Sequence, residues 1–249
     1  QDLEYTTDGN ISQKMMPDNA TYFYTYNTAG KPHAVSAAAY SSGCTSWVDN
    51  YTYDTAGNML TRSGSSGNRY VKWTAFSKPK QISVGSVDCG GDCTTFTYGP
   101  DRQLVKQVDK KGGVTRSIYY IGPHFEVEVS GSLTQYRSHA FANDQVVFTQ
   151  VEDSGGIGWQ AYYPLRDHLG SVDKQYAAMA SPPAAPSIAY SYDAFGRRRN
   201  DNWSNDAAGS KMVATPWNHQ GYTGHEMLDT VQLVHMRGRV YDPTLGRFL

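Results

Sequence analysis

One short pattern recurs along the chain and limits what it can fold into. In its clearest copy, YTYDTAGNMLTR (51–62), an aromatic–x–aromatic triplet is followed by Asp, two small residues, Gly and a polar segment. Looser copies are EYTTDGNISQ (4–13), YTYNTAGKPHAV (24–35), VKWTAFSKPKQISV (71–84), TTFTYGPDRQLVKQV (94–108), IAYSYDAFGRRRN (188–200) and GRVYDPTLGRFL (238–249). Such repetition indicates one small structural unit that is used many times.

Each part of the pattern has a role in a β-hairpin. In YTY, alternation places the rings of Tyr51 and Tyr53 on one face of a strand, where neighbouring copies can stack them. Asp54 can hydrogen-bond the backbone two residues on and start a turn, and Gly57 supplies the positive φ that closes it. Because a lone hairpin is marginally stable in water, each unit needs neighbours, and the pattern predicts a long antiparallel sheet.

The spacing of the repeats agrees with units of two strands and their turns. Successive middle anchors lie about 21 to 23 residues apart, which excludes the longer helical-pair repeats. These anchors are Tyr53, Phe76, Tyr98 and Tyr119.

The composition favours strands and excludes several functions. The 249 residues include 19 Tyr, 8 Phe and 5 Trp, and aromatic residues between Gly and Asn or Asp turns favour strands over helices. A formal net charge of −1 gives no signature of nucleic-acid or membrane binding. The basic run Arg197–Arg199 is followed by Asn200 and Asp201, which favours a solvated turn over a phosphate site. No apolar run reaches about 18 residues, so no membrane span is expected.

The sequence begins and ends in the middle of the repeat pattern. The chain starts with Gln-Asp-Leu-Glu, without Met and without the apolar region of a signal peptide, and it stops at GRFL. We therefore expect a piece of a longer polypeptide.

Helical pattern is scarce. DKQYAAMA (173–180) is compatible with a short helical turn, but the prolines that follow predict a loop in ASPPAAPS (180–187). NDNWSNDAAGSKM (200–212) is predicted to be a second loop. For GHEMLDTVQLVHM (224–236) we expect a short helix or irregular turn at its start, and then a strand over 232–241.

The three cysteines leave several alternatives open. Cys89 and Cys93 bracket CGGDC, whereas Cys44 stands alone in SSGCTSW. The pair can close a small disulfide loop or hold half of a metal site, but no second Cys or His pair lies nearby to complete a zinc tetrad. A local disulfide or free thiols are therefore favoured over a metal.

Two groups of polar residues suggest chemistry without completing a site. His225 and Glu226 lack the second His of an H-E-x-x-H motif, and His235 lies ten residues after His225, so a hydrogen-bonded core role is favoured over a metal site. Asp167, His168 and Ser171 contain the residue types of a triad, but adjacent residues of a strand point to opposite faces. No nucleotide-binding glycine motif is present in the sequence.

Four motifs near the end of the chain together resemble a known family. YYPLRDHLGSVDKQY (162–176), YSYDAFGRRR (190–199), and GYTGHE and YDPTLGRFL within 221–249 occur in the order found in Rhs or YD-repeat proteins, which include the C components of Tc toxin complexes and the teneurins. The residues that carry the repeat and core motifs are Tyr51, Tyr53, Asp54, Gly57, Tyr192, Asp193, Gly196, Asp167, His168, Gly170, Gly224, His225, Glu226, Tyr241, Asp242, Pro243, Gly246 and Arg247.

The resemblance implies an all-β fold in which a long antiparallel sheet of YD-repeat hairpins spirals into part of a hollow shell. It divides the chain into a YD-repeat region, 1–160, and an Rhs core segment, 161–249. The implied function is structural: the shell of a bacterial polymorphic toxin encloses a C-terminal toxin domain. The implied partners are the rest of the shell, the toxin domain, secretion-spike or adaptor proteins and an immunity protein.

Family members commonly cut themselves after the core with a pair of Asp residues in two DPxG motifs, downstream of GRFL. Asp242 belongs instead to YDPTLGRF, which has one residue too many before its Gly, so a structural turn role is expected. We expect no enzymatic activity, catalytic residue, metal or cofactor within this chain. The protein would be made in the cytoplasm and exported, through type VI secretion or a related route.

A binding module is the alternative to a shell. Aromatic-rich, partly wet sheets also occur in carbohydrate- or cell-surface-binding modules, where exposed Trp and Tyr stack on sugar rings. Four tryptophans in loop-like contexts are candidates for that role: Trp47, Trp159, Trp203 and Trp217.

Overall fold

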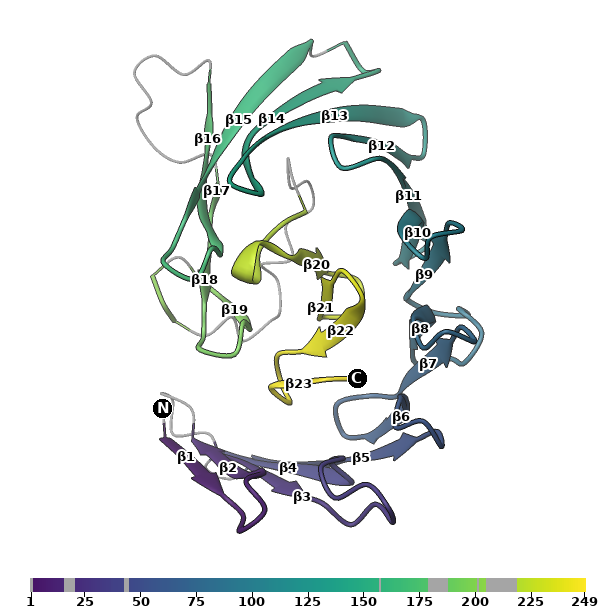
Figure 1. The fold of residues 1–249 in the computed structure, drawn as a ribbon, viewed down its shortest axis with the longest axis vertical. Helices are drawn as coiled ribbons and strands as arrows, with labels where there is room; N and C mark the ends of the chain where they lie inside the picture. Colours follow the sequence, from purple (N-terminus) through teal and green to yellow (C-terminus); the bar gives the residue numbers. More distant parts are fainter. Residues whose placement is uncertain are drawn as a thin grey trace. The chain divides into compact units, whose positions relative to one another are not determined.

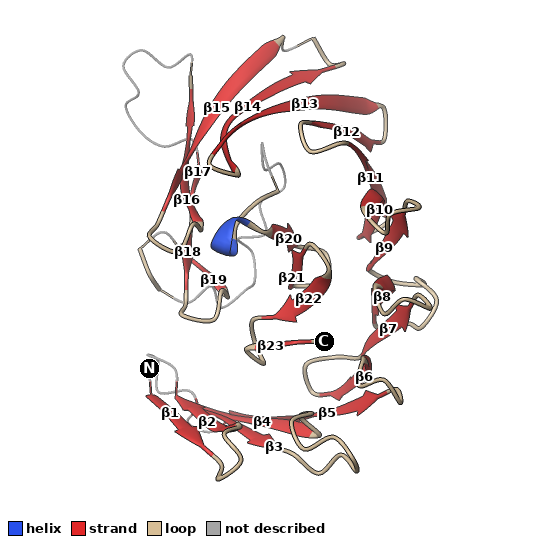
Figure 2. Cartoon of the chain, in the orientation of Figure 1, coloured by secondary structure: helices blue, strands red, loops and turns tan. Residues whose placement is uncertain are grey.

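The computed structural model describes residues 2–15, 21–42, 45–156, 158–178, 188–200, 202–204 and 219–249. Its regular structure is almost entirely strand (Figure 2). Seventeen strands belong to one antiparallel sheet, and smaller sheets contain two and four strands. The predicted all-β class with a long antiparallel sheet is confirmed. Within the described residues, η1 (Tyr222–Gly224) is the only helical turn, and no helix is long and apolar enough to cross a membrane.

The chain divides into two compact units, Gln1–Gly91 and Asp92–Leu249. In unit 1, eight strands pair with their neighbours in chain order. They are β1 (Asp2–Tyr5), β2 (Ile11–Met15), β3 (Thr21–Thr25), β4 (Ala37–Ser42), β5 (Thr45–Tyr53), β6 (Met59–Gly64), β7 (Arg69–Trp73) and β8 (Pro79–Val84). On β3 alternate residues are buried, Tyr22 and Tyr24 among them, and this is the period-two pattern of a sheet with one covered face.

Unit 2 continues the same up-and-down order in nine strands and adds two small sheets. The nine strands are β9 (Cys93–Tyr98), β10 (Leu104–Lys111), β11 (Val114–Ile121), β12 (Phe125–Ser130), β13 (Leu133–Ala142), β14 (Gln145–Asp153), β15 (Trp159–Arg166), β16 (Val172–Ala177) and β17 (Ile188–Ala189). The small sheets are β18 (Ser191–Tyr192) with β19 (Arg198–Arg199), and β20 (Glu226–Leu228) with β21 (Leu233–Met236), β22 (Arg239–Asp242) and β23 (Arg247–Phe248). Within unit 2, β20–β22 lie on the inner side of the curve that β9–β17 make in Figure 1.

The boundary between the two compact units does not coincide with the predicted boundary between the YD-repeat region and the core segment. The units meet at Gly91 and Asp92, whereas the motif-based division between residues 160 and 161 falls inside β15. That division concerns sequence motifs and stays a prediction.

Cys89 and Cys93 are both disulfide-bonded, and because the chain has three cysteines they must be bonded to each other. The disulfide alternative is thus the correct one, and Cys44 lies outside the described residues.

Three local predictions are wrong in part. Residues 172–177 form β16 rather than a helical turn, because Tyr176 and its neighbours pair along β15; the predicted loop that follows lies outside the described residues. The strand expected over 232–241 is a hairpin, β21 and β22, with Arg237 at φ 57° in its turn. The basic run is not merely solvated, since Arg198 pairs with Asp229 at 3.0 Å and lies 4.9 Å from the centre of the Tyr190 ring.

A five-residue turn explains why the repeat pattern folds as it does. The N–H of its first residue donates to the carbonyl of the fifth at 2.8–2.9 Å, and the N–H of the fourth donates to the carbonyl of the first at 2.9–3.2 Å. The segments that have both bonds and of which all five residues are described are Thr6–Asn10, Asp54–Asn58, Thr74–Lys78, Gly99–Gln103, Asp167–Ser171, Asp193–Arg197 and Gly221–His225. Register shifts beside several of these turns mark them as turns with a β-bulge.

Two positions of the turn determine its sequence. The fourth residue has φ between 58° and 91°, which favours Gly, although Ser77 and Arg102 also adopt it. In five of the seven turns the first residue offers a side-chain acceptor to the backbone N–H of the fifth, as Asp54 does to Asn58 at 2.8 Å, whereas Gly99 and Gly221 have no side chain to do so. Thr74 replaces the carboxylate with a hydroxyl at 3.1 Å. The Asp-to-Gly spacing of the repeat is therefore a local hydrogen-bonding requirement.

Candidate functional site

Two of the four C-terminal motifs meet through Arg166 and the turns next to it. Arg166 donates to the carbonyl of Gly170 at 2.9 Å and to the side chain of Gln220 at 2.7 Å, so it joins the turn of DHLGS to the segment that leads into GYTGHE. The N–H of Thr223 donates to Ser171 Oγ at 3.1 Å, and the N–H of Val172 donates to the carbonyl of Gly221 at 3.0 Å. We call the turns Asp167–Ser171, Asp193–Arg197, Gly221–His225 and Asp242–Gly246 the turn cluster.

Glycines bring the turns of this cluster into direct contact with aromatic rings. A Cβ atom built on Gly196 would lie 2.4 Å from the ring of Tyr222, and one built on Gly246 would lie 2.7 Å from the ring of Phe195. Both glycines also have positive φ, 86° and 69°. These positions therefore require glycine for the backbone conformation and for the close approach of a ring.

Aromatic rings form a continuous series through the turn cluster. The centroid of Tyr192 lies 5.9 Å from that of Tyr222, Tyr222 lies 6.3 Å from Tyr241, and Tyr241 lies 5.6 Å from Phe248. Aromatic pairs at such separations contribute stability beyond the area that they bury. The series links β18 to η1, β22 and β23, which follow it much later in the sequence.

The predicted repeat residues of unit 1 lie on a regular hairpin. Tyr51 is buried and lies opposite Arg62 on β6, and Tyr53 lies opposite Met59 and donates to the carbonyl of Val35 at 2.8 Å. The expected ring ladder at Tyr51 and Tyr53 stays a prediction.

Hydrogen bonds set the ionisation of the turn Asp in this hairpin. Burial alone would raise the pKa of Asp54, but hydrogen bonds from the Asn58 side chain and backbone, and from the backbone of Ala56 and Gly57, lower it below 3.8.

Asp242 occupies a turn that is one residue longer than the others. The N–H of Gly246 donates to its carbonyl at 2.8 Å, four residues back, and its carboxylate accepts the N–H of Thr244 at 2.8 Å. The extra residue, noted in YDPTLGRF, is accommodated by this wider turn. Asp242 is 1% exposed, whereas the neighbouring Arg247 pairs with it across β22 and β23 and is partly exposed.

The residues considered for chemistry have other contacts. Asp167 and His168 lie in a turn, so the expectation that they are on a strand is wrong. The Asp167 carboxylate accepts the N–H groups of Leu169 and Ser171 at 2.9 and 2.8 Å. His225 Nδ1 lies 3.0 Å from Thr223 Oγ1.

A second polar group lies between the sheet of unit 2 and the segment that contains β20–β22. Arg137 on β13 is 1% exposed and donates to Glu128 on β12 at 2.9 Å. His219 Nε2 lies 2.9 Å from the same carboxylate oxygen. Tyr120 on β11 donates to Glu226 on β20. We call Tyr120, Glu128, Arg137, His219 and Glu226 the wall–core network.

Neighbouring pairs extend this polar face along the sheet. Asp109 on β10 accepts hydrogen bonds from Arg116 at 2.7 Å and from Thr94 at 2.6 Å. His139 on β13 contacts Thr149 at 3.0 Å and approaches Glu126 at 3.4 Å. The inner side of β10–β13 is thus charged and paired, which is the condition for burying charge.

The wall–core network contains two carboxylic acids whose pKa values are shifted in opposite directions. Burial opposes ionisation of Glu128, but the hydrogen bond and charge of His219, with the charges of Arg137 and Arg116, lower its pKa to about 2. Burial and the charge of Glu126 raise the pKa of Glu226 to about 8. Burial and the carboxylate of Glu226 also raise the pKa of Tyr120. Near neutral pH, Glu128 is therefore ionised and Glu226 is largely protonated.

Sequence reasoning identified the turns and missed the network. Tyr120, Glu128, Arg137 and His219 lie in no repeated motif, and alternation in FEVEVS (125–130) is the one signal that could have indicated a face bearing Glu126 and Glu128. Charged residues at alternate strand positions usually indicate a sheet face that is exposed to solvent. Here that face is buried because another segment of the chain covers it.

Comparison with known proteins supports the fold through structure alone. No family model matches the chain, and no curated protein matches it. Among solved structures, a chain of the crystal structure of TcdB2-TccC3-TEV aligns over 99% of this chain at 16% identity with a TM-score of 0.56. A chain of TcdB2-TccC3-Cdc42 aligns over 99% at 14% identity with a TM-score of 0.53.

The long antiparallel sheet of this chain is therefore a fold that it shares with part of each of those two solved chains. This chain spans 15% of the length of each of those two solved chains, so the likeness concerns one part of a much larger structure.

Proposed function

We propose that this chain is the C-terminal part of an Rhs-type toxin shell and acts by containment. The observation that carries the proposal is the convergence of the DHLGS, YDAFGR and GYTGHE motifs and the YDPTLGRFL turn in one packed cluster, held to the inner side of the unit 2 sheet by the wall–core network. The sheet of unit 2 would form part of the wall, and the segment that contains β20–β22 lies against its inner side.

The physical basis of containment is a wall with few free edges. Strands paired in chain order leave unpaired backbone groups only at the ends of the series, where further repeats would continue the sheet. In repeat proteins stability is approximately a sum of terms between neighbours, so a shell can lengthen without a new core. The role requires no catalytic residue, metal or cofactor in residues 1–249.

The remaining parts of the proposal concern the longer protein. A toxin domain would follow this segment and would be enclosed until delivery. Self-cleavage would use an Asp pair downstream of Leu249, while Asp242 shapes its turn. Partners would be the remaining shell, secretion-spike or adaptor proteins and an immunity protein. The protein would act in bacterial competition after export through type VI secretion or a related route.

The reading frame downstream of Leu249 provides the first test. We expect DPxG motifs and then a domain unrelated to the repeats. A stop codon immediately after Leu249 would contradict the toxin-carrier role.

Expression of the longer chain provides the second test. Replacing a downstream DPxG Asp with Asn should abolish self-cleavage on a denaturing gel, whereas Asp242→Asn should leave the cleaved fraction of folded protein unchanged. Loss of cleavage in correctly folded Asp242→Asn protein would show that the structural assignment of Asp242 is wrong.

A further inference from the structure

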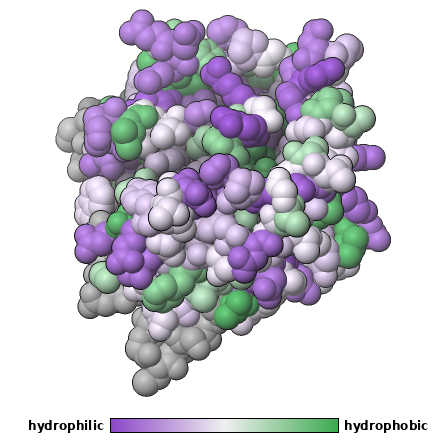
Figure 3. Space-filling model, turned by 60° about the horizontal axis from the view of Figure 1, so that its bottom comes forward, coloured by the Kyte–Doolittle hydropathy of each residue, from purple (hydrophilic) through white to green (hydrophobic). Residues whose placement is uncertain are grey.

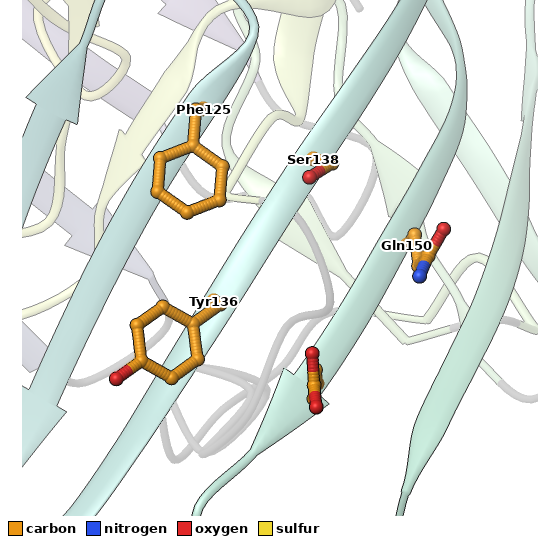
Figure 4. Close-up of a pocket in the computed structure, with 5 residues that line it drawn as sticks. Phe125, Tyr136, Ser138 and Gln150 are labelled. Atoms are coloured by element: carbon orange, nitrogen blue, oxygen red, sulfur yellow. The ribbon is translucent and has the colours of Figure 1, made fainter.

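A shallow hollow lies on the outward side of β12–β14 in unit 2. It is lined by Phe125, Tyr136, Ser138, Gln150 and Glu152, and its volume is about 300 Å³ (Figure 4). The residues that alternate with this set, including Glu128, Arg137 and Thr149, are buried on the opposite side of the sheet. The hollow is therefore separated from the wall–core network by the sheet itself.

Two aromatic rings form a flat floor at one end of the hollow. The centroids of Phe125 and Tyr136 are 6.4 Å apart, and the ring planes differ by 18°. Figure 4 shows the two rings side by side, with their faces turned in the same direction and without overlap. Tyr136 remains 43% exposed. Both rings thus present a face to a ligand rather than to each other.

Polar groups follow in register on the neighbouring strands. Phe125 lies opposite Ser138, and Ser138 lies opposite Gln150. Tyr136 lies opposite Glu152, and Glu152 lies opposite Trp159, which is 55% exposed. Directly opposite residues share a face of an antiparallel sheet. Rings therefore lie on both sides of a carboxylate.

The polar side chains of the hollow are available to a ligand. Within the described part of the chain, the side chains of Ser138, Gln150 and Glu152 make no hydrogen bond to another group of the protein. Together they offer a hydroxyl, an amide that both donates and accepts, and a carboxylate that accepts. No Lys or Arg is among the lining residues.

We propose that this hollow is a binding site for neutral oligosaccharides. The C–H face of a pyranose ring packs on the negative face of an aromatic ring, and its hydroxyls reach amide and carboxylate groups at the edge. Glu152 without a lining cation disfavours sialylated or sulfated sugars and nucleotides. The site is independent of the toxin in the proposed function and would let the outer wall attach to a glycan surface.

The tryptophans first considered for sugar binding have a different distribution. Trp47 and Trp159 belong to strands β5 and β15, so their predicted loop context is wrong. Trp203 is 65% exposed in a turn, and Trp217 lies outside the described residues. Of the four, Trp159 extends the floor of the hollow, because it lies in register with Glu152.

A glycan array probed with the full 249-residue chain tests the proposal. We expect binding to neutral oligosaccharides, confirmed by calorimetric titration with the best of them. Tyr136→Ala should weaken binding by about tenfold, because it removes half of the ring floor. Tyr5→Ala is the matched control, since Tyr5 is 58% exposed at the end of β1, and it should leave the affinity unchanged.

Several outcomes would overturn the proposal. These are no binding to any neutral glycan by folded protein, equal affinity in the Tyr136→Ala and unmodified chains, and binding confined to sialylated or sulfated glycans. A second variant, Glu152→Gln, keeps the shape of the site and should weaken binding of the selected sugar. Thermal melting of each variant separates loss of binding from loss of folding. Binding of proline-rich peptides in place of glycans would assign the hollow to a protein partner instead.

Discussion

His219 Nε2 lies 2.9 Å from Glu128 Oε2, although 91 positions separate the two residues in the chain. The same carboxylate oxygen accepts a hydrogen bond from Arg137 on the adjacent strand. Glu128 therefore connects the sheet to the segment that lies against it. The contact makes the packing of that segment dependent on the ionisation of one buried acid.

Removing the charge of Glu128 should destabilise unit 2. In Glu128→Gln, the buried Arg137 guanidinium loses its carboxylate partner, and we expect a loss on the order of 3 kcal/mol in the free energy of unfolding near pH 7. Urea denaturation measures the change. Glu152→Gln, at an exposed carboxylate on the other face of the same sheet, should change the free energy of unfolding by less than about 0.5 kcal/mol. Equal effects of the two substitutions would contradict the role of Glu128.

The same acid should govern stability at low pH. Its pKa is about 2 in the folded protein, below the ordinary value of 4.5, so the folded form binds fewer protons between those values. The stability that Glu128 contributes is complete above pH 4.5 and is lost as the pH falls towards 2. Glu128→Gln should flatten the pH dependence in that window. An unchanged slope of stability against pH would argue against this assignment.

Glu226 should have the opposite effect on the pH dependence of stability. Its pKa is raised to about 8, so the folded protein binds more protons than the unfolded chain between pH 4.5 and 8, and stability falls as the pH rises through that window. Glu226→Gln mimics the protonated acid. It should therefore be more stable than the unmodified chain at pH 8 and similar to it at pH 4.5, as measured by thermal melting. A variant that is less stable at pH 8 would contradict the raised pKa.

Gly196 and Gly170 provide a matched test of ring packing in the turn cluster. Both occupy the fourth position of the turn at φ 86° and 83°, so alanine costs about 1 to 2 kcal/mol at either site through backbone strain. Only at Gly196 would the added Cβ meet a ring at 2.4 Å; at Gly170 the nearest atom is a flexible Gln145 amide at 3.4 Å. We expect Gly196→Ala to cost about 1 to 3 kcal/mol more in urea denaturation. Equal costs would show that Tyr222 moves aside freely.

Two other turns of the chain have Thr in place of the turn Asp, and they suggest a control for the carboxylate of Asp193. Asp193 is 5% exposed, and its Oδ1 accepts the N–H groups of Phe195 at 2.8 Å and Arg197 at 2.9 Å. Asp193→Ala leaves these donors without a partner and should cost about 1 to 3 kcal/mol. Asp193→Thr keeps an acceptor of the kind that Thr6 and Thr74 provide, and it should recover part of that loss. Thermal melting compares the two, and a Thr variant no better than Ala would contradict the capping role.

The surface of the protein mixes polar and apolar residues. In the face that Figure 3 shows, hydrophobic residues lie in separate small groups among hydrophilic ones. Sequence reasoning did not foresee that the covered side of β10–β13 is the charged side. The outward side instead carries Ile121, Tyr136 and Trp159, all at least 43% exposed. Alternation along a strand assigns its residues to two faces, but it does not determine which face another segment covers.

The turns follow from local sequence alone, because their bonds join residues no more than four positions apart. Asp54 and Gly57, or Asp193 and Gly196, specify a hairpin wherever they occur, and a series of hairpins specifies an antiparallel sheet. The close approach of Gly196 to Tyr222 and the contact of His219 with Glu128 depend on the folding of the whole segment, because they join residues 26 and 91 positions apart. The repeated turn is a local property of the chain, whereas the wall–core network arises from packing between distant segments.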